Sequence, residues 1–113
     1  MEKPCKGDIW MVNLDPVREH EQSGTRPALI ISVDLFNHGP ADLVVVLPIT
    51  SRNKGIPFHV EINPPEGGLN YKSFIKCEDI RSISKCRLSQ KLGSISNQTM
   101  YEVEDRLRIL LNL

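Results

Sequence analysis

Short apolar runs separated by turn residues constrain the fold of this chain more than any other feature. The runs are rich in Val and Ile, and Gly, Pro, Asn or Asp residues lie between them. They read IWMVNL at 9–14, ALIISV at 28–33, LVVVLPI at 43–49, FHVEI at 58–62 and SFIKCE at 73–78. Several short β-prone runs at this spacing predict a small barrel or sandwich.

Differences between the runs predict how each strand is buried. The second and third runs are almost continuously apolar, which predicts central strands covered on both faces. The FHVEI run alternates, as a half-exposed strand does. Pro48 predicts a bulge or an edge at the end of the third strand. The stretches at 80–85 and 86–95 are more polar and predict shorter strands or turns.

The last segment predicts an amphipathic helix over 96–113. Its apolar residues recur at helical spacing, and they are Met100, Val103, Leu107, Leu110 and Leu111. Ser96 or Asn97 can cap the N-terminus of this helix. A chain of 113 residues with 40 % hydrophobic content suits one domain with one core, which we assign to residues 1–113.

The charge pattern leaves room only for a local cationic surface. Basic and acidic residues balance at 14 each, which excludes a long-range cationic field. Between Lys72 and Lys91, however, six residues are basic and two are acidic. This basic run fits either a polyanion-binding patch or solvated strand edges that Lys and Arg protect from aggregation.

Cysteine and histidine usage predicts neither a metal centre nor a disulfide framework. Cys5, Cys77 and Cys86 are odd in number and widely spaced, and they form no C-x-x-C pair. His38 and His59 have no recognisable neighbours in the sequence, so they receive no role. No apolar stretch reaches the length of a signal peptide or a membrane span. We therefore expect a cytoplasmic protein without metal, cofactor or membrane association.

Three polar loops adjoin strand ends and carry residues suited to RNA cleavage. They read EHEQSGTRP at 19–27, PITSRNKG at 48–55 and FIKCED at 74–79. Metal-free cleavage requires a base for the ribose 2′-hydroxyl, donors to the phosphate and an acid for the leaving 5′-oxygen. Carboxylates, imidazole, guanidinium and hydroxyls can supply these parts. At one rim of a small barrel the loops would join His20, Glu21, Arg26, Thr50, Ser51, Lys76 and Glu78.

The same side chains also fit purely structural roles. Arg26 would pair with a neighbouring glutamate at the start of the second strand. Thr50 and Ser51 would bond to their own turn backbone. Lys76 and Glu78 lie two apart on one predicted strand and would form a surface pair on one face. Composition and spacing leave both sets of roles open.

The order of the segments resembles the MazF/PemK (Kid) family of bacterial toxins. The resemblance runs from about Lys6 to the C-terminus. It rests on GDIWMVNLDP, HEQSGTRPALIIS, LPITS followed by KGIPFHVEI, SFIKCEDIRSISKCRL and the final amphipathic helix. The G-D-I-W, E-Q-S-G-T-R-P and P-I-T-S blocks are each short, but they occur in the family's order and at its distances.

This resemblance implies a fold, an activity and two catalytic residues. The implied fold is mainly β, an SH3-like or plasmid-maintenance-toxin barrel of about five to seven short strands with a C-terminal α-helix. The implied protein is a homodimeric toxin of a type II toxin-antitoxin system that inhibits translation and growth. It would cut single-stranded mRNA at short sequences without metal, leaving 2′,3′-cyclic phosphate and 5′-hydroxyl ends. Arg26 and Thr50 match the family's catalytic Arg and Thr.

Further roles follow from the resemblance by position. Glu21 matches a Glu implicated in catalysis in some members, and His20 matches the His of Kid-like members. The Arg and Asp of those members are replaced by Lys76 and Glu78, and Lys lacks the bidentate fork of Arg. We therefore predict His20, Glu21 and Glu78 as possible acids or bases. The predicted RNA contacts are Gln22, Ser51, Phe58, Lys76 and Arg81. Trp10 is expected in the core, whereas Phe36, Phe58 and Tyr71 are candidates for stacking on bases.

The resemblance also implies a partner and leaves an alternative. A cognate MazE/PemI-like antitoxin would place a flexible acidic tail in the RNA grooves. The alternatives are a non-catalytic gyrase poison of the same fold, like CcdB, and a catalytically inactive relative. CcdB proteins require a Trp-Gly-Ile ending, whereas this chain ends Leu-Leu-Asn-Leu and has no Trp after Trp10. This ending favours the nuclease branch.

Overall fold

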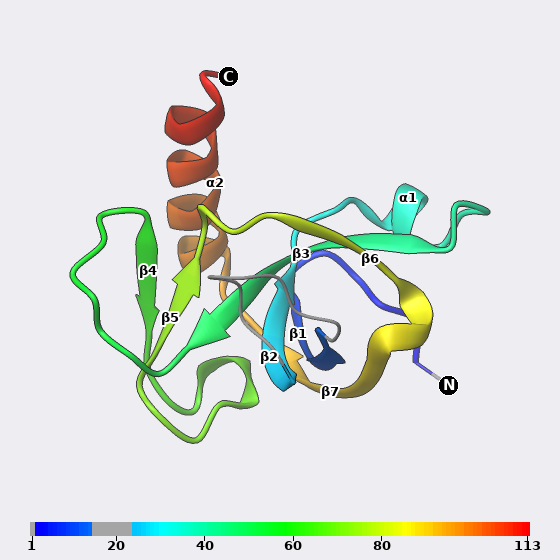
Figure 1. Cartoon of the computed structure of the whole chain (residues 1–113), viewed down its shortest axis with the longest axis horizontal. Coiled ribbons are helices and arrows are strands. Elements are labelled where there is room, and N and C mark those ends of the chain that lie inside the picture. The colour runs from blue at the N-terminus through cyan, green and yellow to red at the C-terminus, as the bar shows by residue number, and fades with distance from the viewer. Residues whose placement is uncertain (1, 15–23) are drawn as a thin grey trace.

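The described residues form a mainly β fold with a C-terminal helix, as predicted (Figure 1). The structure is a computed structural model that describes residues 2–14 and 24–113. Its elements are β1 (Asp8–Asn13), β2 (Thr25–Ile30), α1 (Asp34–Asn37), β3 (Leu43–Thr50), β4 (His59–Ile62), η1 (Glu66–Gly68), β5 (Ser73–Lys76), β6 (Arg81–Ser84), η2 (Lys85–Arg87), β7 (Leu88–Ser94) and α2 (Asn97–Leu111). The helix α1 was not predicted, because four residues are too few for apolar periodicity to reveal.

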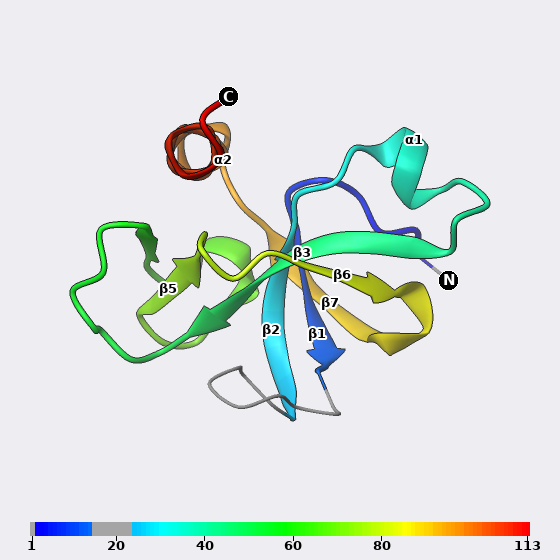
Figure 2. The same cartoon turned by 45° about the horizontal axis from the view of Figure 1, so that its top comes forward.

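The strands form an open, barrel-like antiparallel sheet in which β3 is the central element. Hydrogen-bonded neighbours follow the order β4-β5-β3-β2-β1-β7, and β6 also pairs with β3. Val46 pairs with Ile30 of β2 and with Arg81 of β6, so these two strands lie on opposite edges of β3. Further along the edge that β6 occupies, β5 pairs with Ile49 and Thr50. The end of β3 is therefore enclosed by β2 on one side and by β5 on the other (Figure 2).

On the edge of β3 that β6 and β5 share, pairing is interrupted where Pro48 lies. Val46 pairs with Arg81 of β6, and Ile49 pairs with Ile75 of β5. The two positions on β3 are three residues apart, whereas their two partners are six residues apart. The three extra residues belong to the turn between β5 and β6. Pro48 falls inside this interruption, a position where a strand tolerates proline. The sequence predicted a bulge or an edge at this point; the strand continues to Thr50, and the interruption falls where its partner changes from β6 to β5.

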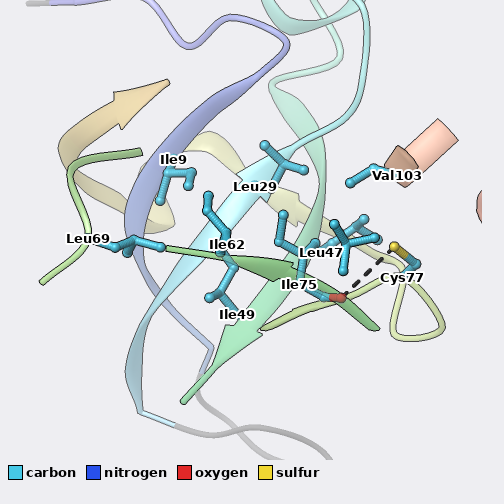
Figure 3. Packing of buried hydrophobic residues seen from close by; sticks show 10 residues of the cluster. Ile9, Leu29, Leu47, Ile49, Ile62, Leu69, Ile75, Cys77 and Val103 are labelled. Carbon is cyan, nitrogen blue, oxygen red and sulfur yellow. Dashed lines mark hydrogen bonds between the residues drawn. The ribbon is translucent and has the colours of Figure 1, made fainter. Parts of the chain in front are cut away.

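The core consists of two apolar clusters on the two faces of the sheet. One contains residues of β1, β2, β3, β4 and β5 together with Val103 of α2 (Figure 3). The second includes Trp10, which is 7 % exposed, so its predicted core position is confirmed. Met100 and Leu107 of α2 also pack against the first cluster. In the last helical turn, Leu110 and Leu111 are exposed.

Ser96 supplies the N-cap of α2, one of the two residues predicted for this role. Its Oγ accepts a hydrogen bond from Thr99 N at 3.1 Å, which satisfies one of the free N–H groups at the helix start. Asn112 ends the helix in the left-handed conformation. No helix in the described ranges, 2–14 and 24–113, is long and apolar enough to cross a membrane.

Candidate active site

The antiparallel register places Arg26 and Thr50 at the same end of the sheet. The last pair between β2 and β3 joins Ala28 to Pro48. Two residues beyond it on each strand lie Arg26 and Thr50, and both side chains line the same two hollows. Residues two positions apart on a strand point to one face, so this register brings the predicted guanidinium and hydroxyl together.

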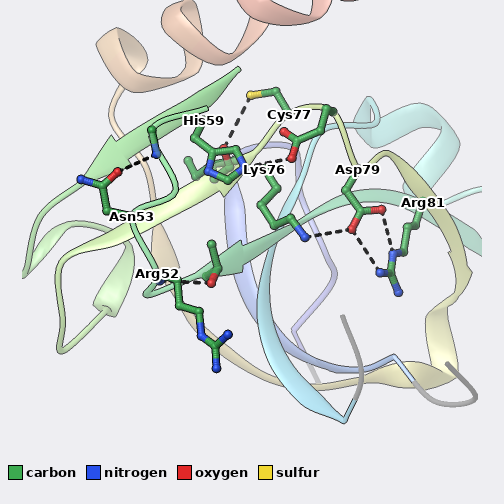
Figure 4. Close-up of polar contacts among 11 residues, drawn as sticks. Arg52, Asn53, His59, Lys76, Cys77, Asp79 and Arg81 are labelled. Carbon is green, nitrogen blue, oxygen red and sulfur yellow. Dashed lines mark hydrogen bonds and ion pairs between the residues drawn. The ribbon is translucent and has the colours of Figure 1, made fainter. Parts of the chain in front are cut away.

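The larger hollow is a cleft of about 330 Å³ with a cationic wall. Its lining residues, here called the polar cleft, are Arg26, Thr50, Ser51, Arg52, Lys54, His59 and Lys76. Four of these seven residues are Arg or Lys, and none is acidic. Figure 4 shows Arg52, His59 and Lys76 around this region. Clefts lined by one sign of charge concentrate ligands of the opposite sign, so this one suits an anion.

An adjoining pocket of about 180 Å³ shares Arg26, Thr50 and Ser51 with the polar cleft. Its other wall includes Leu69, Asn70 and Tyr71, from the loop that follows η1. Tyr71 is 75 % exposed and therefore offers a free ring face beside the cleft. Gly68 holds this loop against β7, since a Cβ on it would lie 2.0 Å from the carbonyl oxygen of Leu92.

Thr50 takes part in the turn contact that was predicted as its structural alternative. Its Oγ1 accepts a hydrogen bond from Arg52 N at 3.2 Å. A hydroxyl that accepts in this way keeps its own hydrogen to donate. The structural and the chemical roles of Thr50 are therefore compatible.

His59 and Glu78 form an ion-pair geometry beside the polar cleft. The Nε2 atom of His59 lies 2.8 Å from Oε2 of Glu78, and the His59 side chain is 3 % exposed. The Nδ1 atom of His59 is buried and has no hydrogen-bond partner among the described residues. Buried polar atoms are nearly always paired, so an unpaired one calls for a specific explanation. Glu78 was predicted as an acid or base, and the structure adds His59 as its partner.

Lys76 and Arg81 share a different carboxylate, that of Asp79 (Figure 4). Arg81 contacts it through two nitrogens at 3.2 and 3.1 Å, and Lys76 Nζ lies 3.5 Å from it. The structural alternative that paired Lys76 with Glu78 is therefore wrong. The strand β5 ends at Lys76, so the alternation of side chains does not extend to Glu78.

Of the other residues predicted to contact RNA, some line the polar cleft and others lie away from it. Ser51 lines both the cleft and the adjoining pocket. Phe58 packs against the first core cluster, and Arg81 is held by Asp79 outside the lining of the cleft. Phe36 is 36 % exposed on α1, away from the cleft lining. His20, Glu21 and Gln22 lie outside the described residues.

The predicted basic run at 72–91 does not gather into one surface. Lys72 lies 3.6 Å from Glu61, and Lys91 lies 3.5 Å from both Glu2 and Asp8. Of the six basic residues in the run, Lys76 lines the polar cleft, and the other cations of the cleft come from β2 and from the loop after β3. Most of the run thus matches the alternative of solvated, paired strand edges.

Sequence reasoning missed His59, Arg52 and Lys54. His59 is two residues before Glu61 in the alternating FHVEI run, so the sequence already placed its side chain on the face opposite Val60. Its cross-strand partner is Lys76, which only the register reveals. Arg52 and Lys54 belong to the rim loop 48–55, whose position was predicted but whose cations received no role.

This arrangement offers the groups that phosphate chemistry uses. Arg26 provides planar N–H donors suited to phosphate oxygens, and Thr50 provides a hydroxyl beside them. Imidazole titrates closest to neutral pH and can give or take a proton. A cationic wall, a hydroxyl and an imidazole in one cleft suit stabilisation and proton transfer at a phosphodiester.

Comparisons with known proteins agree with the resemblance seen in the sequence. Residues 5–111 match the family model described as PemK-like, MazF-like toxin of type II toxin-antitoxin system. A crystal structure of MazF from Deinococcus radiodurans is similar at 30 % identity and a TM-score of 0.88, with all of both chains covered. A MazE-MazF complex from the same organism matches at 26 % identity and a TM-score of 0.81, covering 100 % of this chain and 99 % of that chain.

A further similar structure is an endoribonuclease in complex with its cognate antitoxin, from Mycobacterial species. It matches at 24 % identity and a TM-score of 0.79, covering 100 % of this chain and 97 % of that chain, and so supports the fold. The family match does not favour the gyrase-poison alternative. The matching model is that of the PemK-like, MazF-like toxins, which the G-D-I-W, R-P and P-I-T-S blocks also resemble. This chain belongs to the PemK-like, MazF-like toxin family of type II toxin-antitoxin systems.

Proposed function

We propose that this chain cleaves single-stranded mRNA at specific short sequences, without metal, and thereby inhibits translation and growth. The observation that carries the proposal is that Arg26 and Thr50 line one cleft, whose lining among residues 2–14 and 24–113 has four cations and no carboxylate. The phosphodiester backbone is the polyanion that such a cleft suits. Toxins of this family are generally endoribonucleases, which supports the same reaction.

Arg26 and Thr50 are the proposed donors to the scissile phosphate. During attack by the ribose 2′-oxygen on phosphorus, negative charge builds on the non-bridging oxygens. Preorganised donors aimed at these oxygens lower the barrier. The products of this attack are a 2′,3′-cyclic phosphate and a 5′-hydroxyl end, because the 5′-oxygen leaves as the new bond forms.

His59 and Glu78 are the proposed proton-transfer pair on the described side of the cleft. Glu78 orients the imidazole through the contact at 2.8 Å. One proton must leave the 2′-hydroxyl and one must reach the 5′-oxygen, so one imidazole can serve as base or as acid. The buried Nδ1 atom of His59 can gain a hydrogen-bond partner when RNA binds. Catalytic hydrogen bonds often become short only in the complex with substrate. His20 and Glu21 remain proposed for the complementary step.

Recognition of the RNA is proposed to involve the two loops beside the cleft. The loop 51–57 supplies Ser51, Arg52 and Lys54, and the loop 63–72 supplies Asn70 and Tyr71. Single-stranded RNA is held by base stacking as well as by charge, and Tyr71 offers an exposed ring for this purpose. Ser51, Lys76 and Gln22 are proposed as additional RNA contacts.

A cognate antitoxin is the proposed protein partner. Two of the similar structures are complexes of a toxin with its antitoxin. An acidic, flexible segment would complement the cationic wall of the polar cleft and exclude RNA from it. We further propose a homodimer in the cytoplasm, where its mRNA substrate is found.

Incubation with a long single-stranded RNA in EDTA, followed by sequencing of the fragment ends, tests the activity. Discrete cuts with 2′,3′-cyclic phosphate and 5′-hydroxyl ends are expected from the wild type and not from Arg26→Ala. Arg108→Ala, on the exposed end of α2, is the matched control and should cut normally. Intact RNA with the wild-type protein would refute the proposed activity and would point to a catalytically inactive relative.

A further inference from the structure

We propose that Cys5, Asp34 and His38 form a binding site for a divalent transition metal of the zinc class. The ligand atoms of these three residues lie within 4.8 Å of one another. Thiolate sulfur, imidazole nitrogen and carboxylate oxygen are the protein ligands of Zn²⁺. Three such ligands from one protein leave a fourth position for water, as in many zinc sites.

The distances are close to those that a tetrahedral ion requires. The Sγ atom of Cys5 lies 3.9 Å from Nε2 of His38. Bonds of about 2.3 Å to sulfur and about 2.0 Å to nitrogen place these two ligands roughly 3.6 Å apart around zinc. Asp34 begins α1 and His38 directly follows its last residue, four positions on, so the two lie on one side of this helical turn. Asp34 is exposed, and a rotation of its side chain can bring an oxygen to the ion.

Two hydrogen bonds of the present structure bear directly on this site. Lys6 N donates to Oδ1 of Asp34 at 2.8 Å, which leaves the second carboxylate oxygen for a metal. Nε2 of His38 lies 2.7 Å from the carbonyl oxygen of Pro4. Binding of a metal at Nε2 therefore exchanges this hydrogen bond for a coordinate bond, and the ring proton then resides on Nδ1.

The segments that carry the ligands are each anchored to the sheet. Cys5 N donates to the buried carboxylate of Asp8 at 2.9 Å, and Trp10 Nε1 donates to the same carboxylate at 3.3 Å. On the other side, Asn37 is fully buried, and its Nδ2 donates to the carbonyl oxygen of Ser32 at 2.8 Å. Anchoring from both sides lowers the cost of ordering the ligands when a metal binds.

The charges around Cys5 favour a cation. The carboxylates of Asp34 and Asp8 lie beside Cys5, and Lys91 lies 3.5 Å from the Asp8 carboxylate. The same negative surroundings attract a divalent cation, which displaces the thiol proton when it binds. Neither of the other two cysteines has this environment. Cys77 is buried with its thiol pKa raised to about 12, and Cys86 is exposed beside Ser84.

The proposed metal site is separate from the polar cleft. Asp34 and His38 lie on and next to α1, which packs near the start of β3, whereas the cleft lies at the end of β3 (Figures 1 and 2). The ion would therefore tie the segment before β1 to α1 and would take no part in RNA cleavage. This proposal does not depend on the proposed nuclease activity.

Cobalt(II) titration of the full chain without an affinity tag tests the site. One equivalent of Co²⁺ should produce a thiolate-to-cobalt charge-transfer band and the visible bands of a tetrahedral ion, and zinc should displace them. Loss of even an outer-shell partner costs about 10- to 100-fold in metal affinity, so Cys5→Ser should weaken cobalt binding at least about 10-fold and remove the charge-transfer band. The matched control, Cys86→Ser, should bind as the wild type does.

Two further measurements make the outcome decisive. His38→Gln should weaken cobalt binding but keep the charge-transfer band at saturating metal. Zinc should raise the unfolding temperature of the wild type and of Cys86→Ser, but not of Cys5→Ser. Circular dichroism verifies that each variant is folded. A wild type without the charge-transfer band, or a band that persists in Cys5→Ser, would overturn the proposal.

Discussion

Replacing Arg26 by lysine tests whether the cleft stabilises a phosphate by geometry or by charge alone. The substitution keeps a cation at the start of β2 but removes the planar fork that can hold two phosphate oxygens. Arg52, Lys54 and Lys76 still line the cleft in this variant. RNA binding should therefore change little, and the cost should fall on the chemical step.

The expected magnitude follows from the loss of one preorganised donor. Removing such a donor from a site that stabilises developing negative charge costs about 100- to 1,000-fold in kcat, or about 2.7–4 kcal/mol. We expect Arg26→Lys to lose about 100-fold in single-turnover cleavage at saturating protein, with an RNA Kd within about threefold of the wild type. A single-turnover assay separates the chemical step from binding and product release.

Arg52→Ala is the matched control, because Arg52 lines the same cleft and its hydrogen bond to Thr50 uses the backbone N, which the substitution keeps. It should weaken RNA binding and leave the saturated rate nearly unchanged. If Arg26→Lys cleaves as fast as the wild type, Arg26 acts only as a charge and our assignment of it as a phosphate donor fails. If its Kd rises while its saturated rate holds, Arg26 is a binding residue.

Three further predictions concern residues that the structure places precisely. His59→Gln keeps a hydrogen-bond donor for Glu78 but removes the imidazole. The cleavage rate should therefore fall about 100-fold or more, and one limb of the pH–rate profile should disappear. An unchanged profile would show that His59 takes no part in the chemistry. Lys76→Ala should lower the slope of log K against log salt for single-stranded RNA by about 0.7, whereas Lys72→Ala, outside the cleft, should leave that slope unchanged. Partial burial opposes the ionisation of Glu66, but hydrogen bonds from Thr99 and Ser96 outweigh it and lower the pKa of this carboxyl group. Its contribution to stability is therefore present above the unfolded pKa of about 4.3. That contribution is lost as the pH falls through the lower folded pKa. Urea unfolding at neutral and at acidic pH should show a smaller acid loss for Glu66→Gln than for the wild type, and equal losses would contradict this linkage.

The strands could be predicted because their signal is local. Each apolar run reports its own burial pattern, so β1, β3 and β4 were located to within a residue or two. The cap of α2 was also readable, since Ser96 bonds to a backbone N–H only three residues away. Periodicity placed Leu110 and Leu111 on the apolar face of α2 but could not show that they are exposed, because it does not report which part of that face is covered.

Motifs in the sequence pointed to residues that share a cleft, whereas contacts set by strand register were missed. Arg26 and Thr50 belong to short blocks with a family resemblance, and they do lie in one cleft. His59 and Glu78 are 19 residues apart, on β4 and in the turn after β5, so nothing local joins them. The alternative pair of Lys76 and Glu78 is not formed, because β5 ends at Lys76 and its alternation does not reach Glu78.

The cysteines show the same division between local and tertiary information. Their spacing predicted no metal site, since Cys5 and His38 are 33 positions apart and the strands β1 and β2 lie between them. The sequence by itself determined the strand-forming segments, the capped C-terminal helix and the blocks that identify the family, because these depend on neighbouring residues along the chain. Only the tertiary structure decided which cations share the cleft, which carboxylate orients His59 and which ligands meet at Cys5. Those contacts depend on antiparallel register and on turn lengths, and residues far apart along the chain set both.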